Sequence, residues 1–269
     1  MNNTKPDPNY RVFVAGTDPL PKASPLEGDR FCYNIVMYNY SHFKPKEYDF
    51  SKFEGPKPGE QAVNFTATKL DGECVKLSDF FGNWIVFETG SISCPIYESK
   101  IKPMNELART FPNITFLVLY VREAHPGEKI HQHSSFEEKL SCARLARDED
   151  GESRTIIVDD VEGSAHRLYG SMPNSVYVIN PKGVVVFHGD WNDIDEVKNV
   201  LQERGTMTTR PKERYSGRPS FRGHKRGMLG TLRRAGWVAV WDFMKAFPIM
   251  VFKHIKKLKF QKEKNQCRT

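Results

Sequence analysis

One cysteine lies in a setting that favours thiol chemistry. Cys94 follows the apolar run WIVFETG and precedes IYESKIKPMNELART, in which apolar residues recur at helical spacing. The intervening turn places the thiol at a helix start, with Ser93 as a candidate N-cap and Pro95 in the first helical turn. Unpaired N–H groups and the helix dipole converge there and favour the reactive thiolate. We expect a reachable, ionised Cys94; the alternative is a buried structural thiol.

Side chains that could assist this thiol lie in the same turn and after a second strand. Ser91 and Ser93 place hydroxyls beside the thiol. His125 follows the apolar run ITFLVLYV, which is typical of a central strand, and neighbouring parallel strands share the sheet edge where sites form. A histidine there can move a proton near neutral pH, so His125, and His133 further along the loop, are candidate catalytic residues. Glu123 could orient His125; each of these three could instead be a solvated loop residue.

The other cysteines suggest no disulfide framework. Five cysteines at positions 32, 74, 94, 142 and 267 are irregularly spaced and include no CxxC pair, which fits a reducing compartment. Cys74 in an early hairpin, Cys142 within a helix pattern, or an external thiol could resolve an oxidised Cys94. His131 and His133 have no acid or thiol beside them in the sequence, so we expect no metal site.

The elements that would position these residues alternate along the chain. From residue 61 the pattern predicts the order β-β-β-α-β-α-β-α-β-β-α, with a hairpin turn at Asp71-Gly72 and a helix over SFEEKLSCARLARDED. This order indicates an α/β fold with a mixed sheet and helices on both faces. We predict an N-terminal extension over 1–58, which includes an apolar segment at 31–40, a catalytic domain over 59–204, and a tail over 205–269.

Charge separates the tail from the body. The net charge is +7, but residues from 205 onward hold 17 of the 40 Lys and Arg and three of the 33 acids. The remainder therefore holds 23 basic and 30 acidic residues, which implies two parts with different roles. The start of the chain has no apolar signal segment, so we expect a cytoplasmic protein.

The tail contains one amphipathic stretch. Within 235–262, apolar residues including Trp237 and Trp241 recur every three or four positions, and the lysine-rich KHIKKLKFQKEK follows. Charges and Pro248 interrupt it too often for a membrane span, whereas an interfacial helix fits. A helix packed on the body with solvated lysines explains the pattern equally well. Nucleic acid is disfavoured, because a basic tail alone reads no bases.

Three motifs in order resemble those of the iodothyronine deiodinases, thioredoxin-fold enzymes related to peroxiredoxins. The first, ETGSISCPIY, matches at Gly90, Ser91, Ser93, Cys94 and Pro95, with cysteine where the family usually has selenocysteine. The second is FLVLYVREAH, and the third is the Gln132-His133 pair before a helix. The resemblance covers about residues 59–203. An arginine that helps the family hold the hormone corresponds to Ser175 here.

The resemblance implies a thioredoxin-like fold and reductive deiodination, with no bound cofactor and a thiol reductant as cosubstrate. Cys94 would attack iodine of an iodinated aromatic substrate, and His125 and His133 would assist protonation. Two alternatives are a peroxiredoxin-like thiol peroxidase, which reduces peroxide, and a non-catalytic thioredoxin-fold interaction module. A homodimer and a peripheral membrane location through the tail are further expectations.

Overall fold

The computed structural model describes residues 38–48, 54–205 and 226–266. By its internal contacts the chain divides into two units, Met1–Val36 and Met37–Thr269, and every described residue belongs to the second. Most of the apolar segment at 31–40 and the basic stretch at 206–225 therefore lie outside the described residues. The predicted domain boundaries after residues 58 and 204 stay predictions.

The described residues form a seven-stranded mixed sheet with strand order β2-β1-β5-β4-β3-β6-β7. Strands β3, β4 and β5 are parallel to one another, and the other pairings are antiparallel. The strands are β1 (Thr66–Lys69), β2 (Cys74–Lys76), β3 (Trp84–Gly90), β4 (Ile114–Tyr120), β5 (Thr155–Val158), β6 (Val176–Ile179) and β7 (Val185–Gly189). The α-helices are α1 (Pro95–Thr110), α2 (Phe136–Asp148), α3 (Ser164–Leu168), α4 (Ile194–Glu203), α5 (Gly227–Ala235) and α6 (Trp237–Gln266), and two short 3-10 helices span Pro45–Glu47 and Leu77–Phe80.

The predicted order of strands and helices from β1 to α4 is confirmed. Strands β1 and β2 form the hairpin expected at Asp71-Gly72, where Gly72 adopts a φ of 94° that suits glycine. Helix α2 begins after Ser135, whose side chain accepts a hydrogen bond from the Glu138 N–H. Local turn and capping signals in the sequence thus place these boundaries.

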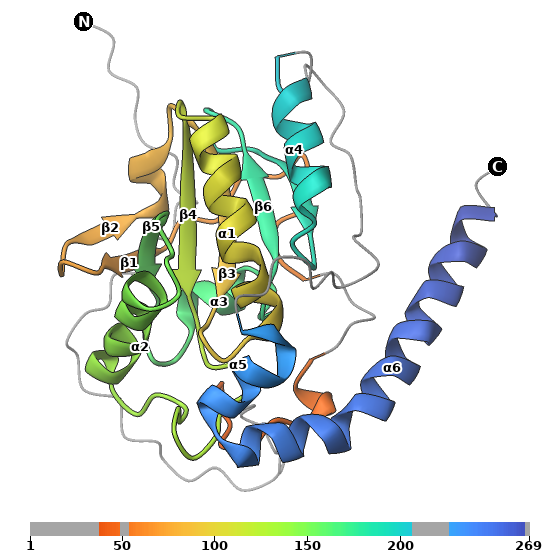
Figure 1. The fold of residues 1–269 in the computed structure, drawn as a ribbon. Helices are drawn as coiled ribbons and strands as arrows, with labels where there is room; N and C mark the ends of the chain where they lie inside the picture. Colours follow the sequence, from red (N-terminus) through yellow and green to blue (C-terminus); the bar gives the residue numbers. More distant parts are fainter. Residues whose placement is uncertain (1–37, 49–53, 206–225, 267–269) are drawn as a thin grey trace, which may run out of the picture. The chain divides into compact units, whose positions relative to one another are not determined.

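Helices cover both faces of the sheet, as predicted (Figure 1). On one face, Val86 and Val118 face apolar side chains of α1, α2 and α4. On the other, Ile85 and Phe87 belong to a core with Ala165 of α3. This alternation follows from the two-residue period of a strand that is buried on both sides.

The register of β3 and β4 brings the two predicted motifs together. Gly90, the last residue of β3, lies opposite Tyr120, the last residue of β4. The turn that leads to Cys94 and the loop that follows Tyr120 therefore leave the sheet at the same edge. A side chain at Gly90 would not fit, because an added Cβ would lie 2.3 Å from the Tyr97 ring.

The tail folds back on this edge of the body through α5 and α6. The Ala235 carbonyl accepts hydrogen bonds from the N–H groups of Lys129 and Ile130, at 2.9 and 3.2 Å. The Glu128 carboxylate caps α6 by accepting from the N–H groups of Trp237 and Val238, at 2.6 and 2.9 Å. Among the helices of the described part of the chain, none has the length and hydrophobicity required to cross a membrane.

A buried charge network supports the face of the sheet beneath α1. Arg154, which is 6% exposed, forms ion pairs with Glu88 of β3 and with Glu152. Glu88 also accepts hydrogen bonds from the side chains of Asn174 and Asn192, both at 2.7 Å. The Tyr97 hydroxyl of α1 donates to Glu152 at 3.0 Å. The network therefore joins β3, α1 and the segments that flank β5 and β6.

We expect Arg154→Met to destabilise the fold strongly, because it leaves the buried carboxylates Glu88 and Glu152 without their cation. Removal of one member of a buried ion pair costs about 3–5 kcal/mol. The matched control is Arg147→Met, which removes a guanidinium from an exposed pair with Asp148 and should change stability by less than about 0.5 kcal/mol. Urea unfolding measures both. Equal losses in the two variants would show that the network does not carry this stability.

Candidate active site

Cys94 lies at the start of α1, where the sequence places it. It is the N-cap residue, with an extended backbone at φ −88° and ψ 110°, and Pro95 is the first helical residue. The Cys94 carbonyl accepts the N–H of Glu98 at 3.0 Å, so the helix begins at the thiol itself. The expectation that Ser93 is the N-cap is wrong. The Ser93 hydroxyl is instead used to hold a neighbouring loop.

The two serines of the turn bridge it to the loop after β4. The Ser91 Oγ accepts the N–H of Ala124, and the Ser93 Oγ accepts the N–H of His125, both at 3.1 Å. Both serines are fully buried. A buried backbone N–H without a partner is costly, so these hydroxyls fix the loop relative to the turn. Ser91 and Ser93 therefore have a positioning role in this arrangement.

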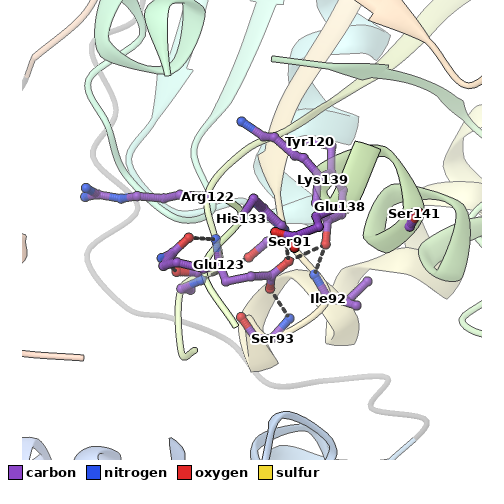
Figure 2. Close-up of polar contacts among 12 residues, drawn as sticks. Ser91, Ile92, Ser93, Tyr120, Arg122, Glu123, His133, Glu138, Lys139 and Ser141 are labelled. Carbon is purple, nitrogen blue, oxygen red and sulfur yellow. Dashed lines mark hydrogen bonds and ion pairs between the residues drawn. The ribbon is translucent and has the colours of Figure 1, made fainter. Parts of the chain in front are cut away.

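Glu123 connects the two motifs (Figure 2). Its carboxylate accepts the Ser93 N–H at 3.0 Å, the Tyr120 hydroxyl at 2.5 Å and the His133 Nε2 at 3.1 Å. Burial alone would raise the pKa of this carboxyl, but the hydrogen bond and charge of His133, with those of Ser93 and Tyr120, lower it overall. Glu123 is therefore an ionised carboxylate with no solvent exposure.

The expected pairing of Glu123 with His125 is wrong, because Glu123 holds His133. The loop closes so that His133, ten residues on, faces the carboxylate. Gln132 supports this closure by accepting the Glu123 N–H at 3.1 Å and donating to the Glu123 carbonyl at 2.6 Å. Sequence reasoning assigned no role to Tyr120 or Gln132. Tyr120 could have been noticed as a polar group that ends an apolar strand.

His125 is buried between two aromatic rings, one from the segment 38–48 and one from helix α6. The ring centroids of Phe43 and Phe243 lie 4.4 and 5.5 Å from that of the imidazole. Burial lowers the pKa of His125 to about 3, against a smaller opposing effect of Glu123. Its Nδ1 has no hydrogen-bond partner among the described residues. The structure thus presents a neutral imidazole with one nitrogen free to bind a polar group.

The expectation that Cys94 is ionised and reachable is wrong for this conformation. The residue is 1% exposed. Burial raises the pKa of the thiol to about 12, although the N–H groups of Tyr97 and Ile96 lower it in part. The carboxylates of Glu123 and Glu88 raise it further. The helix N-terminus is present as predicted, but desolvation outweighs it.

The cover over this edge comes from segments that the sequence did not place there. Tyr48 is 3% exposed and lies close enough to Cys94 for their charges to interact, and Phe43 packs on it at 5.9 Å. Arg122 holds this segment, because its guanidinium lies over the ring of Tyr48 at 5.4 Å, and over two further tyrosines. From the tail, Ala239 of α6 belongs to the same buried cluster as Cys94.

The two candidate resolving cysteines differ in position. Cys74 is exposed on β2, at the far edge of the sheet, and β1, β5 and β4 separate it from β3. At about 4.8 Å per strand it is not brought to the site. Cys142 of α2 is half-buried, and its sulfur lies within 4.8 Å of ligand atoms of Glu123 and His133. Of these two candidates, Cys142 is thus the cysteine that the fold brings to the site. Burial and Glu123 raise the pKa of its thiol to about 12.

This grouping also supplies the acid and the thiol that the sequence did not show beside His133. Glu123, His133 and Cys142 together offer one carboxylate, one imidazole and one thiol. His131, the other histidine of the rejected HxH pair, is exposed and not part of it. Glu123 and His133, two of the three groups, are already hydrogen-bonded to each other at 3.1 Å. A metal ion bound here would have to replace that hydrogen bond.

The strand order, the parallel β3-α1-β4 unit and the cysteine at the N-terminus of α1 define a thioredoxin-like protein with a single cysteine at the helix start. The model of the iodothyronine deiodinase family matches residues 30–204. The chain belongs to this family.

Individual relatives agree with this assignment. The chain is 23% identical to thyroxine 5-deiodinase of Rattus norvegicus over 229 residues, which cover 77% of this chain and 73% of the relative. It is 25% identical to the enzyme of the same name from Gallus gallus over 175 residues, 59% of this chain and 67% of the relative. The corresponding values for Homo sapiens are 23% over 218 residues, 74% and 70%.

Solved structures with partial similarity include two bacterial proteins. One is the thioredoxin domain of a thiol-disulfide oxidoreductase from Bacteroides vulgatus, with a TM-score of 0.44, 16% identity, and coverage of 55% of this chain and 96% of that domain. The other is a thiol peroxidase from Chromobacterium violaceum, with a TM-score of 0.45, 17% identity, and coverage of 56% and 90%. The fold assignment rests on the strand order and connections described above.

We expect His125→Phe to reduce the loss of stability that the wild-type protein shows at acidic pH. The folded state keeps His125 neutral down to pH about 3, whereas an unfolded histidine binds a proton below about pH 6.5. The unfolded state then holds the extra proton, so stability falls as pH falls through this window, by about 2–3 kcal/mol at pH 4.5. Urea unfolding at pH 7.5 and 4.5 should show that the free energy of unfolding falls less between these pH values in His125→Phe than in wild type.

The control for this prediction is His131→Asn, at an exposed histidine of the same loop. It should keep the wild-type difference between the two pH values. If His125→Phe also keeps that full difference, the assignment of a buried neutral imidazole at position 125 is incorrect.

Proposed function

We propose that this protein is a thiol-dependent reductive deiodinase that removes iodide from an iodothyronine or a related iodinated aromatic compound, with Cys94 as nucleophile. The observation that supports this most directly is the joining of two motifs. Glu123, from the loop after β4, is hydrogen-bonded to Ser93 beside the cysteine and to His133. Membership of the deiodinase family supports this reaction class, and the contacts among these residues support the roles proposed for them.

The reaction consumes two thiols for each iodide released. The Cys94 thiolate attacks iodine, the carbon–iodine bond breaks, and its electron pair takes a proton at the ring carbon, so that a sulfenyl iodide remains on Cys94. A reductant thiol attacks this sulfur, iodide and a proton leave, and a mixed disulfide forms. A second thiol restores Cys94 and departs as part of a disulfide. The substrate is reduced by two electrons, and two external thiols are oxidised.

Two histidines have different roles in this proposal. The free Nδ1 of His125 can accept a hydrogen bond from a phenolic hydroxyl, because its ring is neutral and the nitrogen has no partner among the described residues. His133 is hydrogen-bonded through Nε2 to the buried carboxylate of Glu123, which orients its ring. His133 is thus the proposed proton donor, and Glu123 its positioning residue.

A hollow lies beside the loop that carries the two histidines. It has a volume of about 460 Å³ and is lined by residues of 39–44, including His42 and Lys44, and by Gly127, His131 and Gln132. Cationic and imidazole groups on its wall suit an aromatic compound with an anionic group. Ser175, at the position of the family's hormone-binding arginine, is fully buried against Thr89 and cannot take that role. We therefore propose iodothyronines and related iodinated aromatic compounds as the substrate class, without assigning thyroxine in particular.

A specific observation favours one alternative, the non-catalytic interaction module. Cys94 is sealed in the described conformation, and its raised pKa leaves little thiolate at neutral pH. Deiodination therefore requires local displacement of the aromatic cover of this edge, with Tyr48 close to Cys94 and Phe43 and Phe243 against His125. Such local openings have free energies below that of global unfolding.

We expect purified wild-type protein to release iodide from iodothyronines with dithiothreitol as reductant, and Cys94→Ala to release none, because no other thiol lies at the helix start. The control Cys74→Ala removes the exposed cysteine on β2 and should retain activity. Iodide release is measured directly, with hydrogen peroxide reduction in parallel. Peroxide turnover without iodide release would instead establish the thiol peroxidase.

We expect Phe243→Ala to speed alkylation of Cys94 by iodoacetamide by roughly tenfold or more at neutral pH, because it removes part of the cover. The control is Phe252→Ala on the same helix, whose side chain is 69% exposed and should leave the rate unchanged. Peptide mass spectrometry resolves Cys94 from the other cysteines. A thiol that stays unlabelled in both variants, together with no iodide release, would favour the interaction module.

A further inference from the structure

Helix α6 has two apolar faces, and one of them is uncovered. Ala239, Phe243 and Ala246 are buried against the body. At ~100° per residue, a second set of apolar side chains falls on the opposite side of the helix, within an arc of about 140°. Its members and their exposed fractions are Trp237 63%, Trp241 63%, Met244 55%, Phe247 46%, Val251 40%, Phe252 69% and Ile255 49%.

This exposed stripe carries no charged residue between positions 237 and 255. Val240 and Pro248 complete it, and Lys245 and Lys253 fall outside its arc. At about 1.5 Å per residue the stripe extends for roughly 27 Å. A continuous apolar surface of this kind, with two tryptophans and two phenylalanines, marks an interaction site rather than ordinary surface.

Cations border the stripe, and the nearest acid is paired with a histidine. The Arg233 guanidinium lies 4.8 Å from the Trp237 ring, and the Lys245 ammonium lies 4.8 Å from the Trp241 ring. Asp242, the acid of this segment, is 2.9 Å from His42 Nδ1, and its side chain is 14% exposed. The sequence continues with HIKKLKFQKEK, which adds further cations beyond the stripe. The charge at the border of the stripe is therefore positive.

We propose that this stripe of α6 docks on the surface of an anionic lipid bilayer. The helix lies in the plane of the interface, its Trp and Phe side chains enter the boundary between headgroups and acyl chains, and Arg233 and Lys245 meet the anionic headgroups. Tryptophan rings with adjacent cations suit this boundary, where one end of the side chain is apolar and the other polar. Docking uses the face opposite Phe243, so the packing on the body is retained.

A second copy of the chain fits this face less well. In a two-fold interface each stripe would meet its equivalent, and the bordering cations of both copies would face one another. Like charges across such an interface oppose association, whereas an anionic surface attracts them. The charge pattern thus favours lipid as the occupant.

Vesicle co-sedimentation of the full-length protein tests the proposal without reference to enzymatic activity. We expect binding to vesicles with about one-third phosphatidylserine, weakened by salt, and little binding to phosphatidylcholine alone. The double variant Trp241→Glu with Phe252→Glu should weaken this binding at least roughly 100-fold, since two aromatic anchors that would enter the bilayer become charged. Removal of two cations, in Arg233→Gln with Lys245→Gln, should weaken it about 20–30-fold on the anionic vesicles.

The matched control is Leu168→Glu, which introduces the same charge at an apolar position of α3 that is 41% exposed. It should bind vesicles as wild type does, and circular dichroism of each variant shows that the fold is retained. Wild-type protein that stays in the supernatant overturns the proposal, as does unchanged binding of the Trp241 and Phe252 variant. If light scattering shows that wild type is a dimer, that the Trp241 and Phe252 variant is a monomer, and that neither binds vesicles, the stripe is an interface between copies.

Discussion

A single buried carboxylate, that of Glu123, determines the arrangement of the site. It accepts hydrogen bonds from the turn before Cys94 through the Ser93 N–H, from the end of β4 through Tyr120, and from His133 across the loop. A carboxylate without solvent exposure is stable only when its oxygens are satisfied, so each of the three partners has to be in place at once. The loop conformation, the position of the turn and the orientation of His133 are consequences of that requirement.

The same burial sets the protonation of the other groups. Cys94 and His125 share the sheet edge with Glu123, and desolvation makes both neutral: the thiol keeps its proton and the imidazole remains without one. Glu123 alone has enough hydrogen bonds and a nearby histidine to stay charged. The closed conformation thus contains a protonated thiol beside a neutral imidazole and an ionised carboxylate.

The sequence predicted local structure better than long-range contacts. Hydrophobic periodicity, the Asp71-Gly72 turn and the strand–turn–helix at Cys94 gave the order of the elements, because these signals depend on neighbouring residues. Ser93 was assigned to a cap and Glu123 to His125, because short spacing suggested it; in the structure both bond with partners that the register of β3 and β4 and the closure of the loop bring near. The proximity of Cys142 to His133, and the cover by Phe43 and Phe243, have no local signal at all.

Helix α6 contacts the loop that carries both histidines. Glu128, in the loop between His125 and His133, caps its N-terminus, and Phe243 on its inner face contacts the His125 ring. The inner face of α6 buries Ala239, Phe243 and Ala246. Besides the N–H groups that donate to Glu128, the contacts of Asp242 with His42 and of Lys253 with the Pro45 carbonyl hold the helix against the body. The exposed stripe and the contact with His125 therefore lie on opposite faces of the same helix.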